Sequence, residues 1–394
     1  MSDLSITLDA LAQSDSQLSV NAYFDEALFR REQQTIFSQR PRYLGHQLAV
    51  PAPGDFHALP QEGDGRALLH TRKGIELVSN VCRHRQAVML RGRGNTGEHV
   101  VCPLHRWTYD LHGRLVGAPH FQTDPCRHLQ NYPVQHWNGL IFEAGGPGSP
   151  TRNVAADLAE LGPKAEFDFS GYRLDRVHLH ECDYNWKTFI EVYLEDYHVG
   201  PFHPGLGNFV ACDELRWEMG REYSVQTVGV AQHAGEALGK AGSDVYRQWQ
   251  DAVRNYRGQN HDGTPPKHGA IWLTYYPGVM LEVYPHVLVV STLVPQGPRK
   301  TLNVVEFYYP EEIVAFEREY VETQQAAYLE TCVEDDEIAL RMDAGRQALR
   351  ERGDDDAGPY QSPMEDGMQH FHEWYRRVMG EGTAANGTGN SAGN

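Results

Sequence analysis

The spacing of hydrophobic and polar positions changes several times along the chain, and these changes divide it into regions. Near the start, Leu28, Ile36 and Phe37 recur at roughly helical spacing, which predicts a helical segment within residues 1–42 that packs on a later domain. From 43 to 150 the apolar segments are short, as in "IELVSN" and "GLIFEA", and Gly, Asn, Asp and Pro separate them. This pattern predicts a small all-β domain.

The second half of the chain mixes helical and strand-like patterns. Strand-like segments such as "EYSVQTVGV", "HVLVVSTLVP" and "TLNVVEFYYP" follow a helical stretch, and a run without Pro or Gly from Pro310 to Gly345 favours a long helix. We therefore expect an α+β domain over residues 160–380, with an antiparallel sheet covered by helices. Residues 381–394 are rich in Gly, Ala and Asn and are expected to be disordered.

Composition limits the possible partners and the location. The chain has 394 residues, is 40% hydrophobic and carries a formal net charge of −18. Such a charge disfavours nucleic acid and anionic membranes as partners. The polar, acidic start does not resemble a signal peptide, and no apolar run reaches the roughly 18 residues that a bilayer span needs. We expect a cytoplasmic protein, in which the six cysteines are too few for a disulfide scaffold.

Two cysteine–histidine pairs lie in consecutive loops of the predicted β domain. Cys82 and His84 form the first pair, and Cys102 and His105 form the second, with residues 85–101 between them. A zinc site of two cysteines and two histidines is one reading, but zinc fingers usually pair Cys with Cys and His with His. A Rieske [2Fe–2S] cluster instead takes two Cys on one iron and two His on the other. The cluster is the prediction, and zinc is the alternative.

A second group of candidate ligands lies in "NWKTFIEVYLEDYHVGPFHPG", residues 185–205. Its apolar positions predict an amphipathic helix that Pro201 ends, with Glu195 and His198 on one face. His203 lies beyond the break, where the chain can return to the same metal. Two His and one carboxylate, with open positions, suit Fe(II) and O2. Taken alone, the same residues are more typical of a solvated helix face than of a metal site.

The segments "CRHRQAVMLRGRG" and "CPLHRWTYDLHGRL" resemble the Rieske loops of the oxygenase component of Rieske non-haem iron oxygenases, the ring-hydroxylating and demethylating family. The pattern Asn-Trp-Lys followed by an acid, two residues, His, four residues and His resembles the catalytic segment of that family. The resemblance implies a Rieske domain followed by a helix-grip catalytic domain. It also implies that Cys82, His84, Cys102 and His105 hold the cluster. Arg106 stands where the family usually has Gly.

The same resemblance implies the remaining roles at the mononuclear iron. His198 and His203 are the implied ligands, and Glu195 takes the place of an acid that bridges the first of these histidines to a cluster histidine of a neighbouring subunit. Most family members have Asp at that position. The third ligand is implied to be an acid on a C-terminal helix. Within "CVEDDEIALRMDAGR" the best match is Asp336, with Asp335 as the rival.

The implied activity is O2-dependent hydroxylation, or hydroxylation-driven demethylation, of a small organic substrate. Electrons would come from a flavin/iron–sulfur reductase or a ferredoxin, with NAD(P)H acting only through the reductase, and a homotrimer would carry them between subunits. A Rieske-type electron-transfer protein without a mononuclear iron is the alternative. The resemblance leaves mono- and dioxygenation open.

The substrate also stays open at this stage. Strand aromatics of the catalytic domain can form a cage for a quaternary amine, although plain packing is their more usual role. The candidates are Trp272, Tyr275, Tyr276 and Tyr284. An aromatic acid or ether would instead need a basic side chain, for which Arg216 and Arg221 are the candidates.

Overall fold

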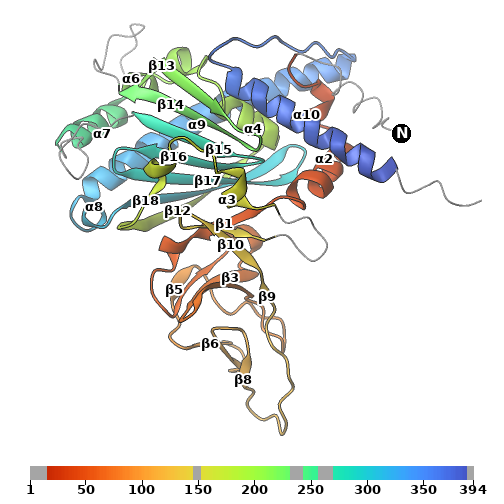
Figure 1. Cartoon of the computed structure of the whole chain (residues 1–394), viewed down its shortest axis with the longest axis vertical. Coiled ribbons are helices and arrows are strands. Elements are labelled where there is room, and N and C mark those ends of the chain that lie inside the picture. The colour runs from red at the N-terminus through yellow and green to blue at the C-terminus, as the bar shows by residue number, and fades with distance from the viewer. Residues whose placement is uncertain (1–15, 145–151, 231–242, 256–268, 388–394) are drawn as a thin grey trace, which may run out of the picture. The chain divides into compact units, whose positions relative to one another are not determined.

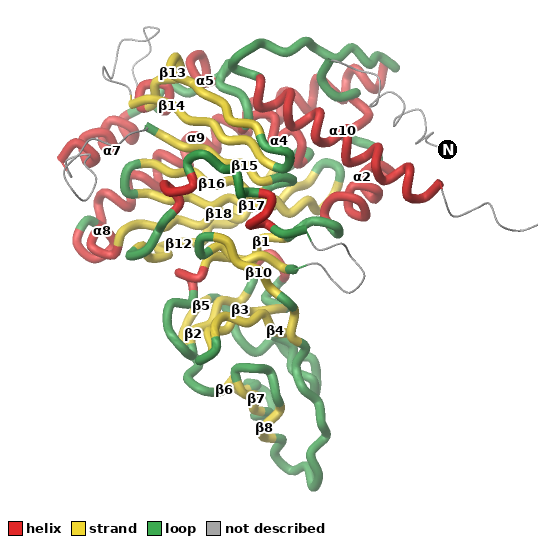
Figure 2. Tube along the Cα trace, in the orientation of Figure 1, coloured by secondary structure: helices red, strands yellow, loops and turns green. Residues whose placement is uncertain are grey.

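The structure, a computed structural model, describes residues 16–144, 152–230, 243–255 and 269–387. The chain forms two compact units. Residues 39–159 and 168–174 make up one, here called the β unit, and the remaining residues make up the other, called the α+β unit. Figure 2 shows strands and loops dominating the β unit, whereas the α+β unit combines a large sheet with long helices. In the described residues no helix is both long and apolar enough to span a membrane.

The β unit contains three small sheets, with strand orders β1-β11-β10, β5-β2-β3-β4-β9 and β6-β7-β8. Buried Leu and Val side chains from these short strands form its cores. Its strands are β1 (Arg42–His46), β2 (Asp55–Ala58), β3 (Arg66–Thr71), β4 (Gly74–Ser79), β5 (Arg93–Asn95), β6 (His99–Val101), β7 (Thr108–Asp110), β8 (Leu115–Gly117), β9 (Asn131–Tyr132), β10 (Val134–Trp137) and β11 (Leu140–Glu143). Its short helices are η3 (Gln47–Ala49), η4 (Pro60–Glu62) and α3 (Val154–Asp157).

The α+β unit is built on a seven-stranded sheet with the order β12-β18-β17-β16-β15-β14-β13. Neighbouring strands from β13 to β18 run antiparallel. The predicted α+β fold with a helix-covered antiparallel sheet is therefore confirmed. The strands are β12 (Tyr172–Cys182), β13 (Val210–Met219), β14 (Tyr223–Val230), β15 (Ala270–Tyr275), β16 (Val279–Tyr284), β17 (Val287–Gly297) and β18 (Lys300–Pro310).

Helices from both ends and from the middle of the chain belong to the α+β unit. They are η1 (Val20–Tyr23), α2 (Glu26–Glu32), the π-helical η2 (Gln33–Phe37), η5 (Lys164–Phe167), α4 (Trp186–Tyr193), α5 (Val199–Phe202), α6 (Leu206–Phe209), α7 (Asp244–Asn255), α8 (Glu311–Phe316), α9 (Arg318–Arg352) and α10 (Asp366–Gly387). Helix α10 continues to Gly387 and so includes residues 381–387 of the tail that was expected to be disordered. Residues 388–394 lie outside the described residues.

One face of the sheet carries two apolar clusters that attach different helices to it. In the first cluster, Met280 and Leu293 of the sheet pack with buried side chains of α2, α4 and α10. In the second, Trp272 and Phe307 pack with buried side chains of α7 and α9. Figure 1 shows α9 crossing behind the strands. The helices α4 and α9 thus lie against the same face of the sheet and contact each other.

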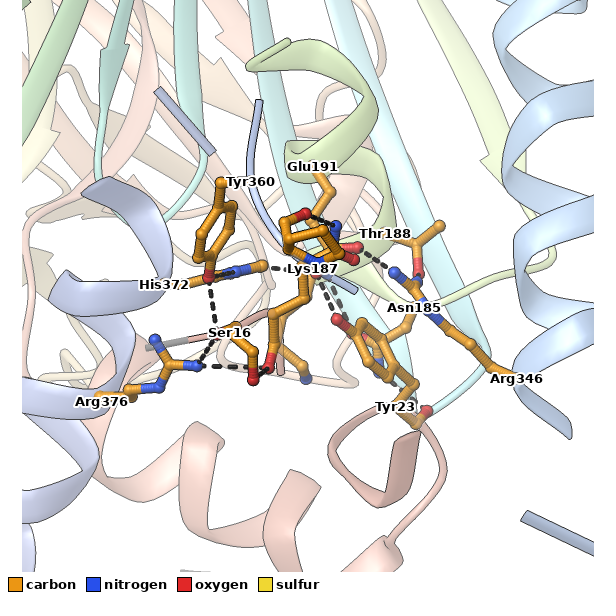
Figure 3. Close-up of polar contacts among 12 residues, drawn as sticks. Ser16, Tyr23, Asn185, Lys187, Thr188, Glu191, Arg346, Tyr360, His372 and Arg376 are labelled. Atoms are coloured by element: carbon orange, nitrogen blue, oxygen red, sulfur yellow. Dashed lines mark hydrogen bonds and ion pairs between the residues drawn. The ribbon is translucent and has the colours of Figure 1, made fainter. Parts of the chain in front are cut away.

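Buried ion pairs fix α4 within this helical layer. Lys187 of α4 lies 2.6 Å from Glu32, and neither side chain is exposed to solvent. One turn later, Glu191 accepts hydrogen bonds from Arg346 of α9 at 2.6 Å and from His372 of α10 at 2.9 Å. Figure 3 shows Glu191 at the point where these side chains converge. Since a buried charge requires its partner, the pairs determine how α4 lies against α9 and α10.

We predict that E191Q lowers the free energy of unfolding by about 3–5 kcal/mol, because Arg346 would remain buried without its anion. The matched control is E322Q, since Glu322 pairs with Arg318 of α9 at the exposed surface. That variant should lose less than about 1 kcal/mol. Urea unfolding at pH 7 measures both. Equal losses in the two variants would contradict the structural role given to Glu191.

We also predict an acid-sensitive component of stability that belongs to Glu191. Burial raises the pKa of this carboxyl, but Arg346 and His372 outweigh burial and lower the pKa from 4.5 to about 2. A folded-state pKa below the unfolded value gives stability that is complete above about pH 4.5 and is lost as the pH falls towards 2. The lost contribution should be about 3 kcal/mol. Unfolding curves from pH 7 to pH 2 should therefore fall less steeply for E191Q than for the wild type.

Candidate active site

The segment with the two histidines differs from its predicted form. Helix α4 ends at Tyr193, before Glu195, and the short helix α5 begins after His198. Pro201 lies in the first turn of α5 and does not end the preceding helix. Proline is tolerated there because the first-turn N–H groups have no intrahelical partner. The two imidazoles therefore flank α5, one at each end.

The two histidines meet an acid of α9. The Nε2 atoms of His198 and His203 lie 2.9 Å apart. The Oδ1 atom of Asp335 lies 2.9 Å from Nε2 of His203 and 3.5 Å from Nε2 of His198. One ligand atom from each residue falls within 4.8 Å of the others, which is the spacing of a metal site. Two imidazoles and one carboxylate form the ligand set that suits non-haem iron.

The outer nitrogens of both imidazoles are held by carboxylates. Nδ1 of His198 is hydrogen-bonded to Glu195, and Nδ1 of His203 lies 2.7 Å from Glu334. Both Nε2 atoms are therefore directed inward, which is the arrangement that metal-binding histidines show. Burial lowers the pKa of His198, but the carboxylates of Asp335 and Glu195 outweigh burial and raise the pKa from 6.5 to about 10. Three carboxylates, those of Glu195, Glu334 and Asp335, surround two imidazoles, and this excess of negative charge fits a bound divalent cation. Glu334 was not foreseen, although it precedes the predicted acid pair.

The structure does not bring Asp336, the predicted third ligand, beside the two histidines. Its carboxylate lies 2.8 Å from Nε2 of His180 and accepts a hydrogen bond from Tyr184 at 2.7 Å. Successive residues of an α-helix point about 100° apart, so only one of two adjacent acids can face the histidine pair. The orientation of α9 selects Asp335, which was the rival candidate.

A pocket opens over the inward face of these three residues. Its other walls are largely aromatic and include Tyr193, Tyr246, Trp272, Tyr284 and Tyr328. Two of the four proposed cage aromatics, Trp272 and Tyr284, are thus in the pocket. The other two are not among its lining residues: Tyr276 packs in the first apolar cluster, and Tyr275 is buried elsewhere in the sheet.

The candidate cluster ligands lie in two loops of the β unit. The Cys82 and Cys102 side chains are buried, whereas His84 is half-buried and His105 is exposed. The two imidazole rings are 4.7 Å apart, and the His84 ring stacks on Trp107. The Nδ1 atom of His84 is buried and has no hydrogen-bond partner among the described residues. Inner thiols, outer imidazoles and an unpaired ring nitrogen fit a Rieske cluster.

Both loops use the same backbone turn. The amide of Gln86 donates to the carbonyl of Cys82, and the amide of Arg106 donates to the carbonyl of Cys102. Gln86 and Arg106 have φ values of 59° and 61°. Glycine adopts this left-handed conformation without strain, which explains its frequent use at the position of Arg106. Arginine preserves the turn here.

Comparison with known proteins identifies the two units. Residues 42–133 match the family described as Rieske [2Fe-2S] domain. Residues 169–381 match the family described as ring hydroxylating alpha subunit (catalytic domain). The chain belongs to this ring-hydroxylating family. It is the oxygenase component of a Rieske-type system, with one [2Fe–2S] cluster and one mononuclear iron, and it performs O2-dependent hydroxylation of a small organic substrate. The zinc site and the electron-transfer protein without a catalytic domain are thereby set aside.

Individual members of the family resemble the whole chain. A putrescine 2-hydroxylase of Ralstonia nicotianae is 63% identical over 379 residues, which cover 96% of this chain and all of that relative. A putrescine 2-hydroxylase of Bordetella bronchiseptica is 60% identical, over 93% of this chain and 85% of the relative. Among solved structures, a quaternary ammonium Rieske monooxygenase has a TM-score of 0.72 at 18% identity and covers 94% of this chain and 98% of its own.

The roles of the two adjacent acids can be separated by metal analysis. We predict that D335N lowers the iron content by about one atom per chain and leaves the acid-labile sulfide unchanged, because the cluster lies in the other unit. The matched control D336N should keep its iron, since Asp336 contacts His180. Iron and sulfide assays on anaerobically purified protein provide the measurement. Iron loss in D336N with retention in D335N would reverse the assignment.

Proposed function

We propose that this oxygenase hydroxylates a short aliphatic diamine, putrescine or a close analogue, at a carbon–hydrogen bond. The observation that carries the proposal is the 63% identity to a putrescine 2-hydroxylase over nearly the whole of both chains. Hydroxylation takes one oxygen atom of O2 into the product and releases the other as water. The two electrons and two protons that this balance needs enter through the reductase and from solvent.

The character of the pocket supports a cationic substrate. No lysine or arginine is among the residues that line it in the described part of the chain, whereas aromatic rings and carboxyl groups are. Aromatic faces and acids attract ammonium groups. Arg216 and Arg221, the candidates for binding an aromatic acid, are exposed and are not lining residues. An anionic substrate would find no counter-charge from an arginine or lysine there.

Within this proposal, His198, His203 and Asp335 hold the mononuclear iron, which activates O2 when it is bound. Glu195 and Glu334 fix the two imidazole rings through their Nδ1 atoms, so that both Nε2 atoms stay available. Cys82, His84, Cys102 and His105 hold the cluster.

The proposal includes the family's route for electrons. A flavin/iron–sulfur reductase or a ferredoxin reduces the cluster near the exposed His105, and the electron passes between subunits of a homotrimer. Glu195 acts as the bridge, since its carboxylate already contacts His198. A solved structure with the same fold is described as revealing inter-subunit electron transfer in a quaternary ammonium Rieske monooxygenase. The proposed location is the cytoplasm.

The function is tested by turnover with defined substrates. We expect the iron-loaded protein, supplied with a reductase and NAD(P)H, to consume O2 with putrescine and to form a product one oxygen atom heavier, with no release of formaldehyde. L-Carnitine, which carries a carboxylate and a quaternary ammonium group, is the comparison substrate. Mass spectrometry and an oxygen electrode provide the measurements. Turnover of L-carnitine without turnover of putrescine would overturn the proposal.

A further inference from the structure

A buried carboxyl group lies in the pocket wall formed by the sheet. Glu282 sits in β16 with only 4% of its surface exposed, and it is one of the residues that line the pocket. In the strand register it stands opposite Trp272 of β15, on the face of the sheet that carries the helices. The pocket therefore has the His198, His203 and Asp335 group in one part of its wall and Glu282 in another.

Among the described residues, the hydrogen-bond partners of this carboxyl are two tyrosine hydroxyls. Tyr284 donates a hydrogen bond to Oε2 at 2.7 Å, and Tyr328 donates to Oε1 at 3.3 Å. Trp272 in turn donates its indole N–H to the hydroxyl of Tyr284 at 3.0 Å. Within the described residues, no lysine, arginine or histidine forms an ion pair with Glu282. A carboxylate this deeply buried normally has a cation partner.

Two other buried glutamates of the same unit, Glu32 and Glu191, illustrate the contrast. Glu32 pairs with Lys187, and Glu191 pairs with Arg346. Burial raises the pKa of Glu282 to about 7; the hydrogen bonds from Tyr284 and Tyr328 lower it, and the negative charge of Asp335 raises it. The group is thus close to ionisation at neutral pH, and a cation that enters the pocket would stabilise its charged form.

From this geometry we propose that Glu282 binds one ammonium group of the substrate and so sets the position of the carbon chain relative to the iron site. The proposal rests on the proposed function, for which it supplies the residue that recognises the amine. An ionised carboxylate accepts about four hydrogen bonds. Two of these are made by Tyr284 and Tyr328, which leaves acceptor positions for N–H donors.

The surrounding side chains favour a primary ammonium group at this position. Such a group donates up to three hydrogen bonds, whereas a quaternary ammonium group donates none and interacts with aromatic faces alone. The rings of Trp272 and Tyr284 contribute the aromatic face, and Glu282 adds the acceptor. The pocket thus combines an aromatic wall with an N–H acceptor, which suits one end of a diamine.

The test is direct binding to the iron- and cluster-loaded protein without O2, measured by calorimetry with putrescine and with butylamine as probes. We expect E282Q to weaken binding of both amines about 30-fold or more, because an uncharged amide replaces the anion. E282D, which keeps the charge but shortens the side chain, should bind more tightly than E282Q. Under turnover, E282Q should raise the KM for putrescine by a similar factor and change kcat less.

The matched control is E306Q. Glu306 of β18 is also buried and also accepts a hydrogen bond from a tyrosine two residues later, at 2.9 Å, but it does not line the pocket. E306Q should bind both amines as the wild type does. Visible spectra and iron content of each variant verify that both metal sites are intact.

The outcomes separate the two proposals. Unchanged amine binding in E282Q, or equal loss in E282Q and E306Q, would overturn the role of Glu282, as would a wild type that binds neither amine. A wild type that binds putrescine through Glu282 but does not hydroxylate it would overturn the proposed function and leave the ammonium site in place.

Discussion

The arrangement of the catalytic unit depends on the buried ion pairs that hold α4 against its neighbours. Glu191 of α4 is almost entirely removed from solvent and Arg346 of α9 is largely buried, so that each charge depends on the other. The chain immediately after α4 carries His198 and His203, and α9 carries Asp335 three turns before Arg346. A constraint that fixes α4 against α9 therefore also fixes the distance between the histidines and their acid.

The two buried ion pairs of α4, Glu32–Lys187 and Glu191–Arg346, are here called the network, and their charge balance differs from that of the pocket. In the network each buried acid has a basic partner from the chain itself, so the charges balance within the fold. Around His198 and His203 there are three carboxylates, those of Glu195, Glu334 and Asp335, for two imidazoles, so a bound cation would balance the charge. At Glu282 the described residues again provide no cation. The acids of these two pairs are thus neutralised by the chain itself, whereas a cation beside Glu282 would have to come from a bound group.

The two metal sites differ in how much they depend on the remainder of the fold. Each cluster loop places a cysteine and a histidine within four residues, and the same turn appears in both, so short-range backbone geometry creates most of the site. The candidate mononuclear site joins a loop near residue 200 to a helix near residue 335, and packing alone brings these segments together. Where the predicted mononuclear site differs from the structure, the difference therefore concerns how the helices pack.

The sequence by itself determined the residues whose relations are local. The spacing of Cys82 and His84, and of Cys102 and His105, indicated the cluster because ligands so close in sequence must also be close in space. Alternation and helical propensity likewise predicted the all-β segment, the antiparallel sheet and the long helix α9. The family resemblance then implied which chemistry these elements serve.

Tertiary structure decided the relations that sequence distance conceals. Asp335 and Asp336 are equivalent as neighbours in a sequence, and only the rotation of α9 against α4 places the first beside the histidines. Glu334 and Glu282 carry no local motif, because their roles arise from the residues that packing brings opposite them. A periodic pattern gives the face of an element, but the partner of each side chain follows from how the elements are assembled.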